Sequence, residues 1–144
     1  MGLINKNTDY AIRALCYMAE RTDAVVSATE LSNALDISWS LIRKILQELS
    51  HKGYVKSYRG KGGGFIMEKS AHHISVLELI NTFQGFIQFN KCRTKGVTCS
   101  NIEYCELRNR VSYIEQQVIA ELKPLTIASL LTRSPTALNQ IAGG

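Results

Sequence analysis

The chain has 144 residues, which is long enough for one domain with a hydrophobic core, or for a small domain with a dimerisation arm. Its hydrophobic content of 45% and charged content of 20% are those of a folded globular protein and argue against a disordered chain. The net charge of +5 is compatible with a polyanionic partner.

The N-terminal residues lack the continuous apolar region of a signal peptide. No apolar run approaches the roughly 20 residues that a membrane helix needs. We therefore expect a cytoplasmic protein that has no membrane partner. In that compartment, grouped cysteines bind metal or do redox work more often than they form structural disulfides.

The first half of the chain predicts a helix-turn-helix. An apolar stripe from Tyr10 to Met18 indicates a helix that begins near Thr8. Ser27-Ala28-Thr29-Glu30 is a capping box that opens a second helix. After a break at Asp36-Ile37-Ser38, a third helix is expected from about Trp39 to His51. Two short helices joined by a three-residue break, the second of them basic, are typical of a helix-turn-helix.

The segment after these helices predicts a β-hairpin. Tyr54 to Tyr58 alternates like a strand, Phe65 to Met67 is a second short strand, and Arg59-Gly60-Lys61-Gly62-Gly63-Gly64 lies between them. Such a loop can also cradle a nucleotide phosphate, but the spacing matches neither the dinucleotide fingerprint nor the P-loop. Glycines that let Arg59 approach a narrow minor groove fit better, so we interpret the hairpin as a wing.

Positive charge concentrates on the third helix and the wing. Residues 43–61 contain six cations and one carboxylate, so their local charge of +5 equals that of the whole chain. The cations are Arg43, Lys44, Lys52, Lys56, Arg59 and Lys61. Phosphate contacts produce this kind of clustering, although a solvated surface can also carry it.

Three helices are expected after the wing. A capping box, Ser75-Val76-Leu77-Glu78, opens a helix that runs to about Phe83. A longer helix after the cysteines carries an apolar stripe, and Pro124 ends it. The stripe consists of Leu107, Val111, Ile114, Val118 and Leu122. A long stripe outside a small winged domain predicts a dimer interface, and packing onto its own domain is the alternative. A short helix around Thr126 to Leu131 follows.

The fold class predicted by these elements is mainly α with a small β-hairpin wing, namely a winged helix-turn-helix domain plus a long dimerisation helix. Residues 1–84 form the predicted DNA-binding domain, and residues 85–105 the cysteine-containing cluster loop. Residues 106–133 provide the dimerisation helix and a C-terminal helix. Residues 134–144 are predicted to be a mobile tail.

Three cysteines, Cys92, Cys99 and Cys105, lie between the winged domain and the long helix. Their gaps of six and five residues are longer than the two-residue spacing of zinc knuckles, which disfavours a structural zinc site. Three thiolates in an open loop can hold an iron–sulfur cluster and leave a further ligand to be found. A cluster-free thiol switch is the alternative, because cationic neighbours can activate the thiols and two of them can form a disulfide.

Other cysteine and histidine residues are interpreted more simply. Cys16 lies among apolar residues of the first helix, which predicts a small buried hydrophobic side chain. His72 and His73 follow the wing and precede a helix cap, so we interpret both as surface residues.

Taken together, these motifs resemble the Rrf-two (BadM-type) family of winged helix-turn-helix transcriptional regulators over residues 1–132. Within it, the chain is most similar to the nitric-oxide-sensitive repressors and the iron–sulfur cluster regulators. The resemblance rests on the Thr8-Asp9-Tyr10-Ala11 opening, on Ile37-Ser38-Trp39-Ser40-Leu41, on residues 59–64, on the cysteine triplet and on residues 125–131.

The resemblance implies a homodimer that binds a double-stranded DNA operator. In the family, the recognition helix enters the major groove and a wing arginine enters the minor groove. Matched residue by residue, the implied DNA-binding positions are Ser38, Trp39, Ser40, Arg43, Lys44, Arg59 and Lys61.

In cluster-binding members of the family the three cysteines hold iron. The resemblance therefore implies an iron–sulfur cluster, [4Fe-4S] or [2Fe-2S], on Cys92, Cys99 and Cys105. The first gap is one residue longer here than in the members compared. Iron–sulfur assembly regulators add a histidine three residues after the last cysteine, where this chain has Arg108, which cannot be a ligand.

Asp9 is the implied fourth ligand. Nitric-oxide sensors of the family use an aspartate near the start of the first helix, contributed by the partner subunit, and Asp9 matches that position. A carboxylate is a weak, displaceable ligand of iron, which suits a cluster that reacts with a small molecule. The alternative is an ordinary first-turn residue that the helix dipole favours.

We therefore expect a dimeric transcriptional regulator, a repressor, whose DNA affinity is controlled by a cluster that senses redox state, nitric oxide or iron–sulfur status. The sequence contains no serine–histidine–acid or paired-carboxylate constellation, so we do not expect an enzyme. A cysteine-based protein-interaction module, in which the basic patch is incidental, is an alternative from another class.

Overall fold

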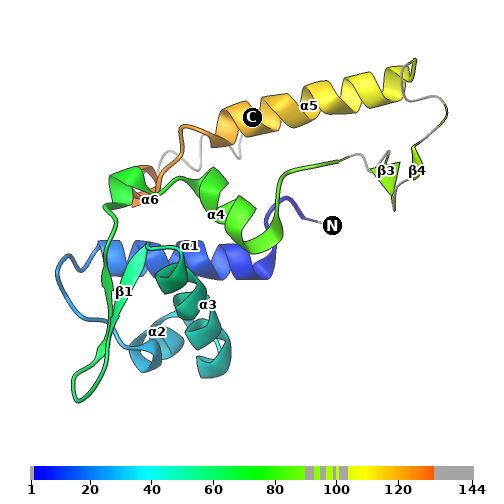
Figure 1. Cartoon of the computed structure of the whole chain (residues 1–144). Coiled ribbons are helices and arrows are strands. Elements are labelled where there is room, and N and C mark those ends of the chain that lie inside the picture. Colours follow the sequence, from blue (N-terminus) through cyan, green and yellow to red (C-terminus); the bar gives the residue numbers. More distant parts are fainter. Residues whose placement is uncertain (1, 90–92, 95–96, 99, 101–103, 132–144) are drawn as a thin grey trace.

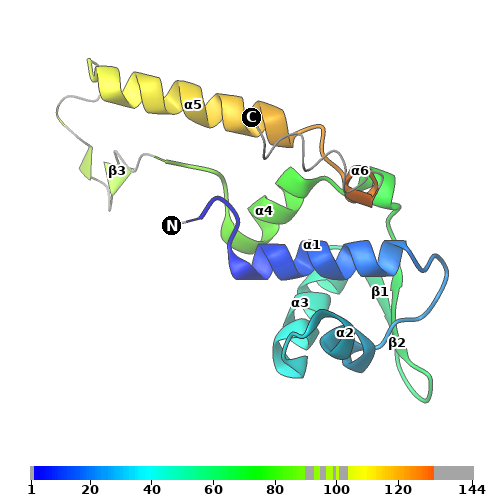
Figure 2. The same cartoon turned by 180° about the vertical axis from the view of Figure 1, so that it is seen from behind.

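The computed structural model describes residues 2–89, 93–94, 97–98, 100 and 104–131 (Figure 1). A helical domain with a β-hairpin occupies the first part of the chain, and a long helix extends away from it (Figures 1 and 2). The elements are α1 (Lys6–Ala19), α2 (Ala28–Leu35), α3 (Trp39–His51), β1 (Val55–Tyr58), β2 (Gly64–Met67), the 3₁₀ turn η1 (Ala71–His73), α4 (Val76–Gln84), β3 (Arg93–Thr94), β4 (Val97–Thr98), α5 (Glu106–Leu122) and α6 (Ile127–Leu131). The predicted mainly α fold with a hairpin wing is confirmed.

The helices begin where side chains replace the missing hydrogen bonds of the first turn. The Ser27 hydroxyl accepts from the Glu30 backbone N–H at 3.0 Å, and the Ser75 hydroxyl accepts from that of Leu77 at 3.2 Å. The Asn5 side chain accepts from the Thr8 N–H at 2.8 Å, so α1 begins slightly earlier than predicted. Gly53 follows α3 with a φ of 82°, a left-handed conformation that glycine adopts without strain.

The predicted apolar stripes meet in one core. Leu15 of α1, Leu46 of α3 and Leu79 of α4 have no exposed surface. Ile127 of α6 is equally buried. Backbone bonds between residues 74–76 and 125–127 attach α6 to the start of α4. The last described helix therefore belongs to the core of the winged domain.

The wing is attached to the rest of the domain by a third segment. β1 and β2 pair in antiparallel fashion, with Val55 opposite Met67. Val26 exchanges two backbone hydrogen bonds with Phe65, both 2.8 Å long, just before α2 begins. A Cβ atom at Gly64 would lie 2.6 Å from the Val26 carbonyl oxygen, so this close approach requires glycine.

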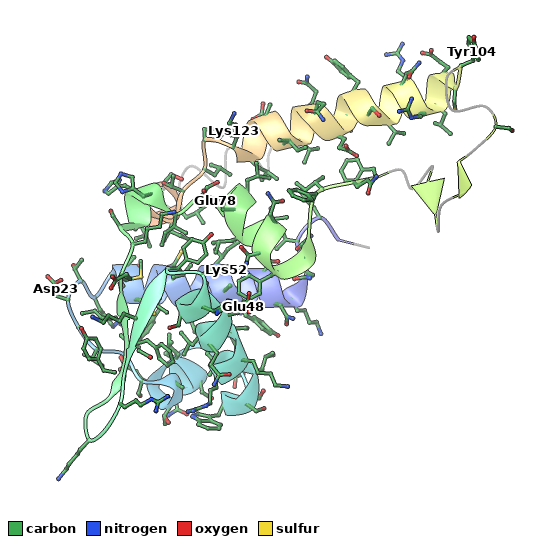
Figure 3. The ribbon with its side chains drawn as sticks, viewed as in Figure 1. Asp23, Glu48, Lys52, Glu78, Tyr104 and Lys123 are labelled. Carbon is green, nitrogen blue, oxygen red and sulfur yellow. The ribbon has the colours of Figure 1, made fainter. Side chains whose placement is uncertain are left out.

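Helix α5 is mostly exposed. It contains no buried residue, and Leu107 and Ile114 expose 71% and 52% of their surface. Figure 3 shows Tyr104 and Lys123 at opposite ends of this helix, with Lys123 nearer the winged domain. Among the described residues, no helix is both long and apolar enough to cross a membrane.

Candidate nucleic-acid interface

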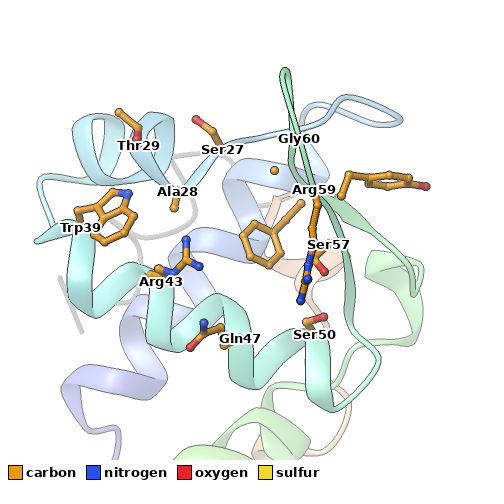
Figure 4. A pocket seen from close by; sticks show the side chains of 14 residues that line it. Ser27, Ala28, Thr29, Trp39, Arg43, Gln47, Ser50, Ser57, Arg59 and Gly60 are labelled. Carbon is orange, nitrogen blue, oxygen red and sulfur yellow. The ribbon is translucent and has the colours of Figure 1, made fainter.

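Helix α3, the wing and the start of α2 surround a hollow of about 580 Å³ (Figure 4). Helix α3 contributes Trp39, Arg43, Gln47 and Ser50 to its lining. The wing contributes residues 57–60 and 63–65, and α2 contributes residues 28–29 with the capping Ser27. Figure 4 shows Arg43 on α3 and Arg59 on the wing at the same hollow. Two cations from different elements are thus brought together.

The exposed face of α3 follows from its sequence. Trp39, Arg43 and Gln47 recur every fourth residue, and all three are exposed. The buried stripe of the same helix consists of Ile42, Ile45, Leu46 and Leu49. Because helical side chains repeat every 3.6 residues, the two sets occupy different faces. One face holds α3 in the core, and the other is free to contact a partner.

The cations at the hollow keep their charge available. The guanidinium carbon of Arg43 lies 5.2 Å from the centroid of the Trp39 ring, a cation–π contact that orients the group without neutralising it. Among the described residues, neither Arg43 nor Arg59 has an ion-pair partner. Both positive charges are therefore available to an external partner.

The predicted DNA-binding residues do not all lie in one place. Trp39, Arg43 and Arg59 line the hollow. Ser38, Ser40 and Lys61 are exposed but do not line it, and the Ser38 side chain makes no capping hydrogen bond at the start of α3.

Lys44 lies on the other flank of α3. It lines a second hollow of about 390 Å³ together with Asn7 of α1 and Thr82 of α4. Helix α3 is therefore bordered by a hollow on each side, one at the wing and one at the start of α1.

Gln47, Ser50, Ser57 and Thr29 also line the first hollow, although no sequence motif marks them as candidate DNA contacts. Gln47 could have been found from its spacing, because it follows Trp39 and Arg43 at the same four-residue interval. Ser57 and Thr29 reach the hollow only through the packing of the wing against α2.

Cys105 is the member of the cysteine triplet that falls within the described residues, and Cys92 and Cys99 lie outside them. Its half-buried thiol is free, and its sulfur accepts a hydrogen bond from the Arg108 backbone N–H at 3.4 Å. Cys105 is also the N-cap of α5. The hydrogen bond holds the sulfur at the start of α5, and cysteine sulfur is the usual ligand of iron in iron–sulfur clusters, so this position fits such a ligand.

Asp9 lies at the other end of the predicted ligand set, in the first turn of α1. Its side chain is 55% exposed and is 3.9 Å from Arg13. The start of α1 is fixed from inside, because the buried Thr8 hydroxyl donates to the Gln84 side chain at 2.8 Å. Gln84 also donates to the Leu3 carbonyl, at 2.8 Å. The position of Asp9 is thus tied to the end of α4, from which the chain continues to the cysteines.

The remaining candidate ligands lie elsewhere. Cys16 is half-buried on α1 and packs against the core. Burial raises the pKa of its thiol above the ordinary value, and the nearby Glu20 carboxylate adds to the shift. His72 and His73 are exposed, as predicted. Among the described residues, no three histidine, cysteine or acidic side chains lie close enough together to hold a metal ion.

A family of known proteins and several solved structures resemble this chain. Residues 4–133 match the family model Rrf2, described as an iron-dependent transcriptional regulator. Among solved structures, CymR (YrzC), the global cysteine regulator of B. subtilis, is 19% identical with a TM-score of 0.72, over 93% of this chain and 99% of that chain.

Two further structures are similar. T. potens IscR is 19% identical with a TM-score of 0.70, over 89% of this chain and 85% of that chain. The oxidized form of Staphylococcus aureus CymR is 16% identical with a TM-score of 0.73, over 92% and 98%. At these identities the likeness to the solved structures concerns the fold.

Proposed function

Because the chain belongs to the Rrf2 family of transcriptional regulators, we propose that it is a homodimeric repressor that binds a double-stranded DNA operator through α3 and the wing. Members of this family are DNA-binding transcriptional regulators. The observation that carries the proposal is the hollow that Arg43 of α3 and Arg59 of the wing both line, each without an ion-pair partner among the described residues.

The dimensions of α3 support this mode of binding. A helix with its side chains is about 10–12 Å wide, which matches the roughly 12 Å major groove of B-DNA. With α3 in that groove, Arg59 and Lys61 would follow the DNA from the wing toward the adjacent minor groove. The hydroxyl groups of Ser27 and Thr29 would then border the phosphates, which position the protein without specifying a sequence.

The exposed stripe of α5 supports the dimer. Leu107 and Ile114 lie one above the other on a helix that buries no residue within its own chain. A second copy would cover these side chains and present two recognition helices to one DNA. Such dimers bind half-sites separated by about one helical turn, or by a multiple of it.

We further propose that Cys92, Cys99 and Cys105, with Asp9 of the partner subunit, hold an iron–sulfur cluster. When bound, such a cluster supplies a redox-active centre that oxidants and nitric oxide can modify. The Arg108 N–H would position the Cys105 sulfur. Gln84 would keep the start of α1, and with it Asp9, fixed against the end of α4. A change at residues 85–105 would then alter how α5 and the winged domain are placed, and so the spacing of the two recognition helices.

DNA binding is tested by titrating labelled DNA fragments at several salt concentrations. We expect steep salt dependence, with a slope that falls by about one in Arg59→Ala because one cation that displaces a counterion from the DNA is lost. Arg110→Ala on α5 is the matched control, since Arg110 is exposed and pairs with Glu106 at 3.4 Å. If the wild-type protein shifts no fragment at any salt concentration, the proposed function is wrong.

Cluster binding is tested by anaerobic purification with an absorption spectrum and an iron and sulfide count. We expect visible bands that disappear in Cys99→Ala and persist in Cys16→Ala, the matched cysteine control. Asp9→Ala should shorten the lifetime of the cluster under oxygen and leave the fold of the apoprotein intact. An unchanged lifetime would count against Asp9 as a ligand.

The cluster-free thiol switch predicts a different result from the same preparation. The protein would then be colourless and free of iron, and oxidation would change its DNA affinity by joining two cysteines. Replacing either of the two joined cysteines by serine would abolish that response. The half-buried, free thiol of Cys105 is compatible with this second candidate.

A further inference from the structure

Gln47 lies on the exposed face of α3. It lies one turn beyond Arg43 and two turns beyond Trp39, and all three side chains line the hollow at the wing (Figure 4). The Gln47 side chain is exposed, and its amide makes no hydrogen bond within the part of the chain that the structure describes. Its donor and acceptor are therefore both available to a partner.

The chemistry of a glutamine amide suits a base edge better than a phosphate. The amide presents an N–H donor beside a carbonyl acceptor, and adenine presents the complementary N7 acceptor and N6 donor in the major groove. A neutral amide releases no counterion from the DNA backbone, in contrast to an arginine or a lysine. In a hollow that Arg43 and Arg59 also line, Gln47 is thus suited to specificity rather than to overall affinity.

We propose that Gln47 reads an adenine in the major groove, about two base pairs from the base that Arg43 contacts. This inference rests on the proposed function, because it requires that α3 enters the groove. Four residues of helix rise about 6 Å, and successive base pairs are about 3.4 Å apart, so the two side chains reach positions about two steps apart.

The contact between Trp39 and Arg43 indicates which base Arg43 would contact. The indole ring holds the guanidinium carbon at 5.2 Å, so Arg43 is oriented before DNA arrives. An oriented guanidinium can form two hydrogen bonds to O6 and N7 of guanine. The expected half-site therefore contains a guanine and, about two positions away, an adenine.

The experiment selects DNA from a pool of duplexes with a randomised central segment, using the full-length protein. Affinity is then measured for the selected site and for each single base-pair replacement. We expect that one A·T pair discriminates, and that its replacement by G·C weakens wild-type binding by about tenfold. In Gln47→Ala, discrimination should vanish at this pair and persist at the others.

A modified base tests the contact at the level of atoms. Substituting 7-deazaadenine removes the N7 acceptor and leaves base pairing intact. It should weaken binding by the wild-type protein several-fold and leave Gln47→Ala unaffected, because the variant has no amide to lose a partner. Gln47→Glu provides a second variant. Its carboxylate only accepts, so preference at this pair should move toward cytosine, whose N4 donates.

Gln116→Ala is the matched control, since Gln116 is an exposed glutamine on the side of α5 opposite the apolar stripe. It should leave the whole specificity profile unchanged. A uniform loss of affinity in Gln47→Ala would mean a backbone contact and would overturn the inference, as would unaltered discrimination at every pair. In both cases the proposed function would stand, whereas failure of the wild-type protein to select any DNA would count against the proposed function itself.

Discussion

The winged domain and α5 differ in how they satisfy their apolar residues. In the winged domain, the stripes of α1, α3, α4 and α6 face one another, and Leu15, Ile42 and Ile127 are fully buried. In α5, a stripe of the same periodicity buries none of its residues. An equal sequence pattern thus has two outcomes, because burial depends on whether the chain supplies the opposing surface. The winged domain supplies its own, whereas no residue of α5 is buried within the chain.

The largest expected effect separates these two regions with one substitution in each. Leu46→Ala removes a side chain with no exposed surface, so the free energy of unfolding should fall by about 2–5 kcal/mol. Leu107→Ala changes a side chain that is 71% exposed, and the winged domain should lose almost nothing. Urea unfolding at low protein concentration measures both. Equal losses in the two variants would mean that α5 is part of the core.

The dimer proposal adds a dependence on concentration to this comparison. Ile114→Asp places a charge in the exposed stripe of α5, and a buried, unpaired charge is strongly unfavourable. The variant should sediment as a monomer at concentrations at which the wild-type protein is a dimer, with a winged domain that melts normally. Asn109→Asp, which adds the same charge to an exposed polar position of α5, is the control. A dimer that tolerates Ile114→Asp would place the interface elsewhere.

The wing offers a second, smaller comparison. Gly64→Ala would drive a Cβ atom against the Val26 carbonyl, which should cost about 1–3 kcal/mol and separate the wing from the start of α2. Gly62→Ala at the wing tip meets no neighbouring atom and should cost only the strain of its positive φ, about 1 kcal/mol. Thermal unfolding ranks the two variants, and DNA binding should suffer more from Gly64→Ala. A reversed order would contradict the role of the Val26–Phe65 pairing.

The first turns of α2 and α3 provide a matched pair of serines. Ser27→Ala removes a hydroxyl that accepts the Glu30 N–H, so stability should fall by about 1 kcal/mol. The Ser38 hydroxyl makes no such bond, so Ser38→Ala should leave the melting temperature nearly unchanged. A reduction in DNA affinity without a loss of stability in Ser38→Ala would identify its hydroxyl as a DNA contact.

The features that the sequence predicts well are local ones. The capping serines and the apolar periodicity of α3 lie within a few residues of what they determine, and the structure confirms those helices. The pairing of Val26 with Phe65 joins segments far apart in the chain, and so does the bond between Thr8 and Gln84. No local pattern marks such contacts. Gln47 has no sequence signal for a different reason. The pattern that predicts a DNA-binding surface is a cluster of charged residues, and glutamine is neutral.

The smallest expected effect concerns the pKa of Cys16, the cysteine that lies outside the cysteine-containing segment. Burial raises the pKa of its thiol above the ordinary 9.0, so the folded protein keeps this proton at a pH where the unfolded chain has begun to lose it. Its contribution to stability is therefore complete below about pH 9 and is lost as the pH rises through the folded pKa. In a variant with serine at positions 92, 99 and 105, alkylation of Cys16 should need a higher pH than alkylation of the same chain in urea. Coincident pH profiles would mean that Cys16 is no more shielded than an exposed thiol, and that the core does not extend to this side of α1.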